Sequence, residues 1–348
     1  MNKALVSMLF ITTASYFTAC SGSGGITGGV VSGPTNTTGT IISHIHDTGQ
    51  SKCYDSSAEI ACPASGQAFF GQDANYSSNP LRFTDNGSTV TDSITGLMWQ
   101  KVDSGTQYNW YQATGIFDAT YNNLATNVCG SLSIGGYSDW RLPSRRELAS
   151  IINYGQFPEG PDNAYFQWSG PDYWTSSETV VSSGVAWGAS GGRITYGFGS
   201  KGGSGLYVRC TRGPSWGQNR FIDNGDGTVS DTMSGLVWQQ NDDGVARNWK
   251  DALAYCENLT FASFSDWRLP DIKELESLVN INSANLTNQM PAVDSTYFPS
   301  TRSSYYWSST TFSFSGQLNY AWYVDFSFGW VDWGGDSKTD YNFTRCVR

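Results

Sequence analysis

The chain has 348 residues, an aromatic content of 15% and a formal net charge of −10. An acidic chain lacks the basic face that general binding to nucleic acid or to anionic membranes requires, which excludes both classes of partner. The two histidines, His44 and His46, lie before the repeated part of the chain, so Ser-His-Asp triads and His-ligated zinc sites are excluded there.

Residues 1–19 have the layout of a bacterial lipoprotein signal peptide. Lys3 precedes an apolar stretch over residues 4–17, which is shorter than the roughly 20 residues needed to span a bilayer. Residues 18–20, Thr-Ala-Cys, resemble a lipobox, whose cysteine becomes the lipid-modified first residue of the mature protein. We therefore expect a cell-envelope protein held in the outer membrane through Cys20, with ordinary secretion and nearby cleavage as the alternative.

Residues 20–50 are rich in Gly, Ser and Thr and show no apolar periodicity. Such a segment buries too little apolar surface to offset its chain entropy, so we expect a flexible tether. His44 and His46 fall inside it, and we interpret them as solvated linker residues rather than as a metal site.

The rest of the chain consists of two copies of one pattern. The copies begin with Arg-Phe-x-Asp-Asn-Gly at Arg82 and at Arg220, and each runs through Gly-Leu-x-Trp, Asp-Trp-Arg-Leu-Pro and Tyr-Trp to a final Arg-Cys. This duplication predicts two tandem domains, residues 51–213 and 214–348. Residues 82–213 of the first copy carry 9 basic and 10 acidic residues, a net charge of −1, and residues 220–348 of the second carry 9 and 16, a net charge of −7.

Six cysteines remain after Cys20, and in an exported protein they predict a disulfide framework. Several connectivities are possible, but the duplication favours one in which each copy closes its own bridge. Each long bridge would stabilise the fold by roughly 4 kcal/mol in the chain-entropy model. The expected pairs are Cys129 with Cys210, Cys256 with Cys346, and the remaining Cys53 with Cys62, which forms a clip at the start of the first domain.

The first predicted element of a copy is a β-hairpin, seen most clearly in residues 220–231. Asn-Gly and Asp-Gly between β-type residues favour a hairpin turn. A calcium loop is the alternative, but the spacing of the acidic residues misses the EF-hand pattern.

Two helices are predicted next. Apolar residues at helical spacing indicate a helix over residues 248–256, with Cys256 near its end. Asp271 and Glu274 have the spacing of a capping box at the start of a second helix. Ser144 and Glu147 have the same spacing in the first copy.

The Asp-Trp-Arg-Leu-Pro motif before the second helix is interpreted as architectural. We expect Asp139 with Arg141, and Asp266 with Arg268, to form buried ion pairs that fix the start of the helix. Short strands are expected later, over residues 320–326 and 329–333, which gives an α+β domain.

In this order, the motifs resemble the DUF1566 family, also called the Lcl C-terminal domain family, over nearly all of residues 82–348. The resemblance implies two tandem C-type-lectin-like domains, each with two helices, short antiparallel strands and long loops. It also implies a disulfide that joins the first helix to the last strand. In the adhesin that gives the family its name, the domain is associated with sulfated glycans. The calcium-and-sugar motifs of true C-type lectins are missing here, so no calcium-bridged sugar site is expected.

We therefore expect a surface module without catalytic residues, cofactor or metal, which binds a glycan or another envelope or host ligand. Aromatic side chains stack on sugar rings and anchor interfaces, which makes Trp322, Trp330 and Trp333 the candidate ligand face. For a polyanion, the candidates are the arginines of the near-neutral first copy: Arg141, Arg145, Arg146 and Arg193.

Two other functions are weighed against this one. The first is a structural or protein–protein component of the envelope. The second is an enzyme similar to the formylglycine-generating enzymes, which share Arg-Leu-Pro followed by Glu but depend on reactive thiols. Because the shared residues are interpreted as scaffold, function is expected where the copies differ, in residues 154–205 and 281–340.

Overall fold

In the computed structural model, both repeats and the segment directly before them lie within residues 41–348. Cys20 and the rest of the proposed signal and tether up to His44 lie outside the described residues. Within the described part of the chain, no helix is long and apolar enough to cross a membrane. The structure describes residues 45–76, 80–156, 160–179, 182–191, 193–203, 205–216, 221–283, 291–314, 316–332, 334 and 336–348.

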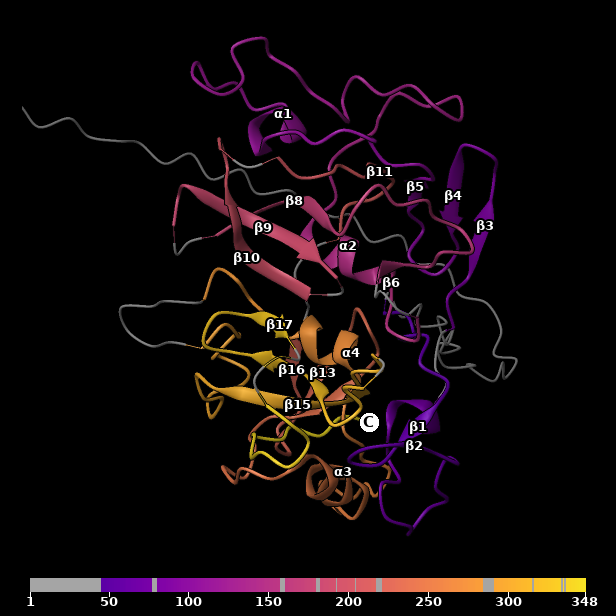
Figure 1. Ribbon diagram of the computed structural model, residues 1–348. Coiled ribbons are helices and arrows are strands. Elements are labelled where there is room, and N and C mark those ends of the chain that lie inside the picture. The colour runs from indigo at the N-terminus through magenta and orange to yellow at the C-terminus, as the bar shows by residue number, and fades with distance from the viewer. Residues whose placement is uncertain are drawn as a thin grey trace, which may run out of the picture. The chain divides into compact units, whose positions relative to one another are not determined.

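The first repeat is built from small antiparallel sheets and two helices (Figure 1). Its first sheet is closed by a strand from the very end of the repeat, in the order β11-β5-β4-β3. A second sheet has the order β8-β9-β10, and a two-stranded ladder joins β6 to β7. The strands are β3 (Phe83–Asp85), β4 (Thr89–Asp92), β5 (Met98–Gln100), β6 (Ile152–Asn153), β7 (Gly160–Pro161), β8 (Asp172–Glu178), β9 (Val185–Ser190), β10 (Arg193–Ser200) and β11 (Thr211–Arg212); the helices are α1 (Trp110–Thr114) and α2 (Arg145–Ser150).

The second repeat has two three-stranded sheets, in the orders β12-β13-β14 and β15-β16-β17, and two helices. The predicted hairpin is confirmed, with Asp223 opposite Val229, and the two predicted short strands are adjacent and antiparallel. The predicted first helix is also confirmed, since it begins after the N-cap Asn248 and contains Cys256. The strands are β12 (Phe221–Asp223), β13 (Thr228–Asp231), β14 (Val237–Gln239), β15 (Tyr305–Thr311), β16 (Ala321–Asp325) and β17 (Trp330–Asp332); the helices are α3 (Trp249–Glu257) and α4 (Ile272–Ser277).

The second helix of each repeat starts as the sequence predicts. Ser144 caps α2 and Asp271 caps α4, and each side chain accepts a hydrogen bond from the backbone N–H three residues later. Glu147 and Glu274 reach back to the N-cap N–H, which completes both capping boxes.

The predicted ion pairs before these helices are wrong in their partners. Arg141 forms two hydrogen bonds with Glu147, at 2.7 and 2.8 Å, whereas Asp139 pairs with Arg212 at 2.7 Å. In the second repeat, Arg268 likewise pairs with Glu274 instead of with the predicted Asp266. The capping box is the reason, because it draws the glutamate back over the helix start, beside the arginine.

All three predicted disulfides are present. Cys129–Cys210 and Cys256–Cys346 each have a Cα–Cα distance of 5.5 Å, and Cys53–Cys62 closes the short loop. Each long bridge lies in an aromatic cluster of its own repeat. The clusters contain Trp110, Trp140 and Trp174 in the first repeat and Trp249, Trp267 and Trp307 in the second.

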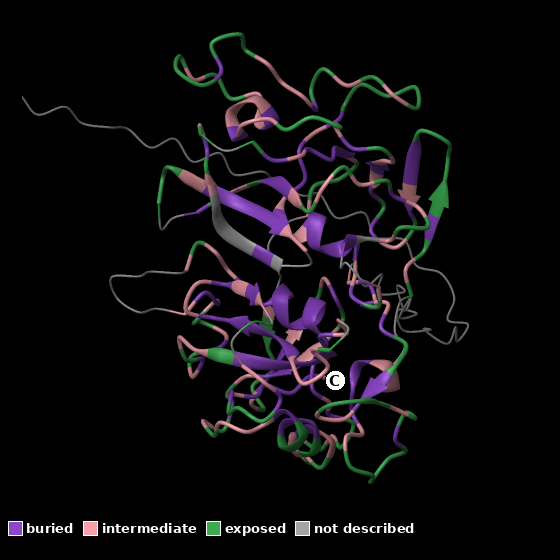
Figure 2. Cartoon of the chain, viewed as in Figure 1, coloured by how far each residue is buried: buried purple, intermediate pink, exposed green. Residues whose placement is uncertain are grey.

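The two repeats share a further apolar core between them. It joins residues around α2 and β9, such as Leu148 and Trp187, to residues around α4 and β16, such as Leu275 and Trp322. Buried residues are concentrated in these sheets and helices, and exposed residues lie in the outer loops (Figure 2). Most of the aromatic residues of the chain are therefore structural.

Residues 45–76 form a segment that we call the N-terminal clip, and it corrects the tether expected up to residue 50. His46, Thr48 and Gln50 are buried, and His46 Nε2 lies 2.7 Å from Asp92. Sequence patterns missed this because the residues are polar and are buried only through specific hydrogen bonds. The clip contains β1 (Cys53–Tyr54), β2 (Glu59–Ile60) and a 3₁₀ turn, η1 (Asp73–Asn75).

Although the clip precedes the first repeat, it packs largely on the second. The Gln50 side chain forms two hydrogen bonds with the backbone of Thr311, at 2.8 and 2.9 Å. The Phe69 ring lies 6.3 Å from the Trp249 ring, and Lys338 Nζ donates to the carbonyl of Asp55 at 2.8 Å.

Candidate functional site

A hollow of about 330 Å³ lies at the start of α2 in the first repeat, and we call it the repeat 1 hollow. Four hydroxyl side chains, an arginine, a glutamate, a leucine and a tryptophan surround it. These residues are Thr114, Arg141, Leu142, Ser144, Glu147, Ser176, Ser215 and Trp216.

Arg141 is held in the wall of the hollow by its backbone and its side chain. Its N–H donates to the carbonyl of Thr211 and its carbonyl accepts from the Thr211 N–H, at 2.8 and 2.9 Å. Its guanidinium forms the paired bonds with Glu147, yet the side chain stays 31% exposed. Part of the Arg141 side chain therefore remains accessible to a ligand.

Glu147 is the buried counter-charge of the site. Burial alone would raise its pKa, but the hydrogen bonds and the charge of Arg141 outweigh burial and hold the pKa of Glu147 below its usual value. The backbone N–H groups of Ser144 and Trp216 also donate to this carboxylate, at 2.8 and 3.2 Å. The hollow therefore presents a fixed cation with its charge largely balanced, beside a set of hydroxyl groups.

The groups around the hollow can form hydrogen bonds and aromatic contacts. The lining residues of the hollow include no thiol or imidazole, and all six cysteines in the described part of the chain form disulfides. Among the described residues, no three His, Cys, Asp or Glu side chains are grouped so that they could hold a metal ion. Hydroxyls and a guanidinium edge can hydrogen-bond a polyhydroxyl or carboxylate ligand, and Trp216 adds an aromatic wall.

Arg145 and Arg146 do not form the exposed polyanion site considered from the sequence. Arg145 is 3% exposed, pairs with Glu276 of the second repeat at 2.7 Å and lies 4.4 Å from the Trp187 ring. Burial lowers its pKa. Arg146 donates to the carbonyl of Ser277. Both point toward α4 because α2 packs against the second repeat, a contact that the sequence of one repeat does not reveal.

A small cavity of about 50 Å³ lies next to this contact between the repeats. Arg146, His46 and Lys273 line it together with Glu276. Lys273 Nζ donates to backbone carbonyls of the clip and of α2, so the charged groups here serve mainly to join the clip and the two repeats.

The predicted tryptophan face is also corrected. Trp322 is fully buried, because its ring packs against Tyr154 and Phe312 in the core that the two repeats share. Trp330 is half-buried, with its ring stacked at 4.6 Å on Phe328, and its role as a ligand contact stays a prediction. Trp333 and the side chain of Arg193 lie outside the described residues.

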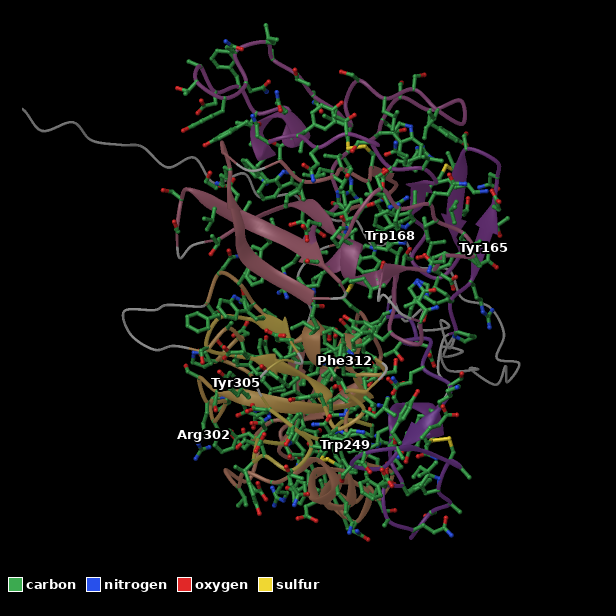
Figure 3. The ribbon with its side chains drawn as sticks, viewed as in Figure 1. Tyr165, Trp168, Trp249, Arg302, Tyr305 and Phe312 are labelled. Atoms are coloured by element: carbon green, nitrogen blue, oxygen red, sulfur yellow. A yellow bond between two sulfur atoms is a disulfide. The ribbon has the colours of Figure 1, made fainter. Side chains whose placement is uncertain are left out.

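Exposed aromatic and cationic side chains of the second repeat occur elsewhere. Tyr305 is 39% exposed at the start of β15, and Arg302 lies near it at the same edge of the repeat (Figure 3). Arg302 packs on the Phe343 ring at 4.9 Å. Trp249, in contrast, is buried in the core of this repeat.

The sequence singles out half of the residues around the hollow, namely Arg141, Leu142, Ser144 and Glu147. It misses Thr114, Ser176, Ser215 and Trp216, because only Ser176 follows a repeated motif and nothing in their spacing shows that they meet. Of these four, only Ser176 lies in the regions where the copies were expected to differ in function.

The chain was compared with known proteins. The family model described as the Lcl C-terminal domain matches twice, over residues 88–212 and 227–348, which together make up most of the chain. No curated protein matches the sequence.

Proposed function

The chain belongs to the Lcl C-terminal domain family and carries two copies of that domain in tandem, and from this premise we propose that it is a non-catalytic binding module of the bacterial cell envelope. Its ligand is a glycan or another molecule of the envelope or of a host surface. A structural or protein–protein role in the envelope is the second candidate.

The repeat 1 hollow is the observation that carries this proposal. Arg141 offers a partly exposed guanidinium, and four hydroxyl side chains surround the same volume. Such a set of donors fixes the orientation of a polar ligand, while the Trp216 ring supplies apolar contact. The described lining residues contain no nucleophile activated by a neighbouring base, which favours binding over catalysis.

Display at the cell envelope follows from the proposed lipidation at Cys20. Residues 18–20 provide the lipobox-like sequence, and the Gly-, Ser- and Thr-rich segment after it would separate the domains from an outer membrane. Intact-mass measurement of the membrane fraction tests this part, since an unmodified Cys20 would contradict it.

A C-type-lectin-like architecture for each repeat is part of the proposal. The support is the Cys256–Cys346 disulfide, which joins the first helix of the second repeat to the end of the chain.

Titration of free thiols separates the binding module from the enzyme similar to formylglycine-generating enzymes. Two reactive thiols in one repeat of the folded protein would favour the enzyme.

Binding itself is tested with the chain that keeps its disulfides intact, on arrays of glycans and of envelope and host surface proteins. We expect retention that Ser176→Trp lowers, because this exposed side chain borders the hollow. Ser133→Trp, at another exposed serine of the same repeat, is the matched control. No retention on any surface, or equal retention of both variants, would contradict the proposal.

A further inference from the structure

The repeat 1 hollow has an equivalent place in the second repeat, because the same hydrogen bonds recur around both. The Ser176 N–H donates to the carbonyl of Pro143 at 2.8 Å, and the Ser309 N–H donates to the carbonyl of Pro270 at 2.8 Å. The first backbone N–H of the second helix also donates to a hydroxyl group in each repeat. The Arg145 N–H donates to Ser177 Oγ at 3.0 Å, and the Ile272 N–H donates to Thr310 Oγ1 at 3.1 Å. The equivalent positions are Arg141 and Arg268, Ser144 and Asp271, Ser176 and Ser309, and Ser177 and Thr310.

In the second repeat, the N-terminal clip occupies this place. Asp73 Oδ2 accepts hydrogen bonds from Thr310 Oγ1 at 2.5 Å and from Thr48 Oγ1 at 2.8 Å. Three residues later, the Tyr76 ring lies 5.5 Å from the Arg268 guanidinium. The clip thus places a carboxyl group on Thr310 and, three positions later, an aromatic ring by Arg268.

The clip leaves the first repeat uncovered at the same positions. Ser309 and Thr310 are 2% and 0% exposed, whereas Ser176 is exposed and Ser177 is half-buried. The side chain of Arg268 is 14% exposed, compared with 31% for Arg141. This difference in exposure is the one expected when a segment of chain binds to one copy of a repeated surface and leaves the other copy open.

The first repeat is electrostatically better suited to receive a carboxylate. In the second repeat, burial and the neighbouring Asp47 raise the pKa of Asp73 to about 7, and Asp271 lies among the acidic groups nearby. The first repeat has the neutral Ser144 in the place of Asp271. A carboxylate that enters the repeat 1 hollow therefore does not meet the negative charge that Asp271 adds near Asp73.

We propose that the repeat 1 hollow binds a segment of a partner protein in which an acidic residue precedes an aromatic residue by three positions. The carboxylate would accept hydrogen bonds from the Ser176 and Ser177 hydroxyls, and the ring would lie on the Arg141 guanidinium. This inference rests on the proposed binding function and narrows its ligand to a polypeptide.

The clip supplies the probe, since residues 69–76 contain Asp73 and Tyr76 in the required spacing. A fluorescent peptide of these residues is titrated with the full chain, and its anisotropy is followed up to about 1 mM protein, a range that includes weak complexes. We expect saturable binding to one site per chain. Peptides with Asp73→Asn or Tyr76→Ala should bind about tenfold more weakly, because each loses a charge-assisted or cation–π contact.

Three protein variants locate the site. Ser176→Trp should abolish binding by filling the hollow, and Ser133→Trp should leave it unchanged. Ser144→Asp copies the residue of the second repeat and keeps a good helix N-cap. Ser144→Asp should weaken binding of the Asp73 peptide several-fold but leave binding of the Asp73→Asn peptide nearly unchanged. This pattern distinguishes a local charge effect from a folding defect.

Two results would overturn the inference. One is the absence of saturable binding to the unchanged chain, and the other is binding that ignores Ser176→Trp, which would place the peptide elsewhere, such as on the second repeat. If a glycan is retained through the hollow while the peptide is not, the proposed function stands and only the polypeptide ligand is rejected.

Discussion

The two repeats cover their first helix with different pieces of chain. In the first repeat, residues 115–127 fold back over α1, and the Tyr121 ring stacks on Tyr111 at 5.8 Å. In the second repeat, the N-terminal clip covers α3 with Phe69. Cys129 lies 19 positions after Trp110, whereas Cys256 lies 7 positions after Trp249, so the first cover is an insertion and the second comes from outside the repeat.

Beneath these covers, the two repeats keep the same buried polar network. Arg209 and Arg345, which precede the last cysteine of each copy, donate to backbone carbonyls of the strand-end segments at 2.6–2.8 Å. Each also faces an aspartate, Asp103 or Asp242, that accepts from a buried tyrosine. The comparison teaches that the repeated motifs maintain the interior, while the covers, and with them the exposed surface, vary independently.

The largest expected effect comes from breaking this shared network. Arg209→Met and Arg345→Met should each reduce the free energy of unfolding by about 3–5 kcal/mol, because removing one partner leaves buried carbonyls and a carboxylate unpaired. Arg345→Met should be the milder, since Arg302 also reaches Asp242, at 3.5 Å. Urea denaturation measures both. If either variant lost less than about 1 kcal/mol in its free energy of unfolding, the network would not stabilise both repeats alike.

Removing the long disulfides should give nearly equal effects in the two repeats. Replacing both cysteines of Cys129–Cys210 or of Cys256–Cys346 by alanine should cost about 4 kcal/mol in each case, since the bridges span 81 and 90 residues. Removing Cys53–Cys62, which spans 9, should cost less, about 2–3 kcal/mol. Thermal unfolding of the three variants is the measurement, and a clip bridge that matters as much as the long ones would contradict the entropic explanation.

A pH effect should distinguish two equivalent lysines. Lys201 and Lys338 each lie over the first tryptophan of their helix, at 4.4 and 4.2 Å, but Lys201 pairs with Glu178 and Lys338 with a clip carbonyl. Burial lowers the pKa of Lys338 to about 7. The folded state then binds fewer protons than the unfolded state between about pH 7 and 10, so the free energy of unfolding should rise across that window.

Lys338→Met should reduce this rise by on the order of 1 kcal/mol per pH unit at most, while Lys273, whose pKa burial lowers to about 8, keeps part of it in place. Lys201→Met is the matched control and should leave it in place. Urea denaturation at several pH values between 7 and 10 provides the test. An unchanged slope in Lys338→Met would mean that the clip does not keep this lysine from water.

The smallest effects are expected from the covers themselves. Tyr121→Ala should cost about 1 kcal/mol, because its ring is 46% exposed and contributes one aromatic contact. Phe69→Ala should cost about the same on the second repeat. Limited proteolysis provides the specific measurement, since each variant should expose only its own cover to cleavage. Cleavage in both covers of either variant would show that they are coupled.

Much of the scaffold could be predicted from the sequence. The hairpin turn at Asn224-Gly225 and the capping boxes at Ser144 and Asp271 depend on neighbouring residues, so local chemistry suffices to predict them. The disulfides follow from comparing the copies with each other. The clip could not be predicted in this way, because Thr48 and Asp73 gain their partners from residues more than 20 positions away.

The candidate site shows the same division. Arg141 is a candidate because it is an arginine of the near-neutral first copy, but the motif predicts Asp139 as its partner, whereas the structure pairs it with Glu147. Composition alone predicts Trp322 as a ligand contact, because a tryptophan in a Gly-rich region has the same composition whether its face of the sheet is covered or exposed. Tertiary packing decides this, and it places Trp322 in the interior against Tyr154 and Phe312.

The sequence by itself determined the duplication, the bridges and the starts of the helices, because each depends on spacing along one chain or on identity between two copies. Only the tertiary structure decided which copy of the surface at the start of the second helix is open. That choice depends on where the clip folds, and its burial in the second repeat comes from hydrogen bonds between distant polar residues. The same fold turns Arg145 inward and leaves Arg141 at the hollow, although the two arginines are four positions apart.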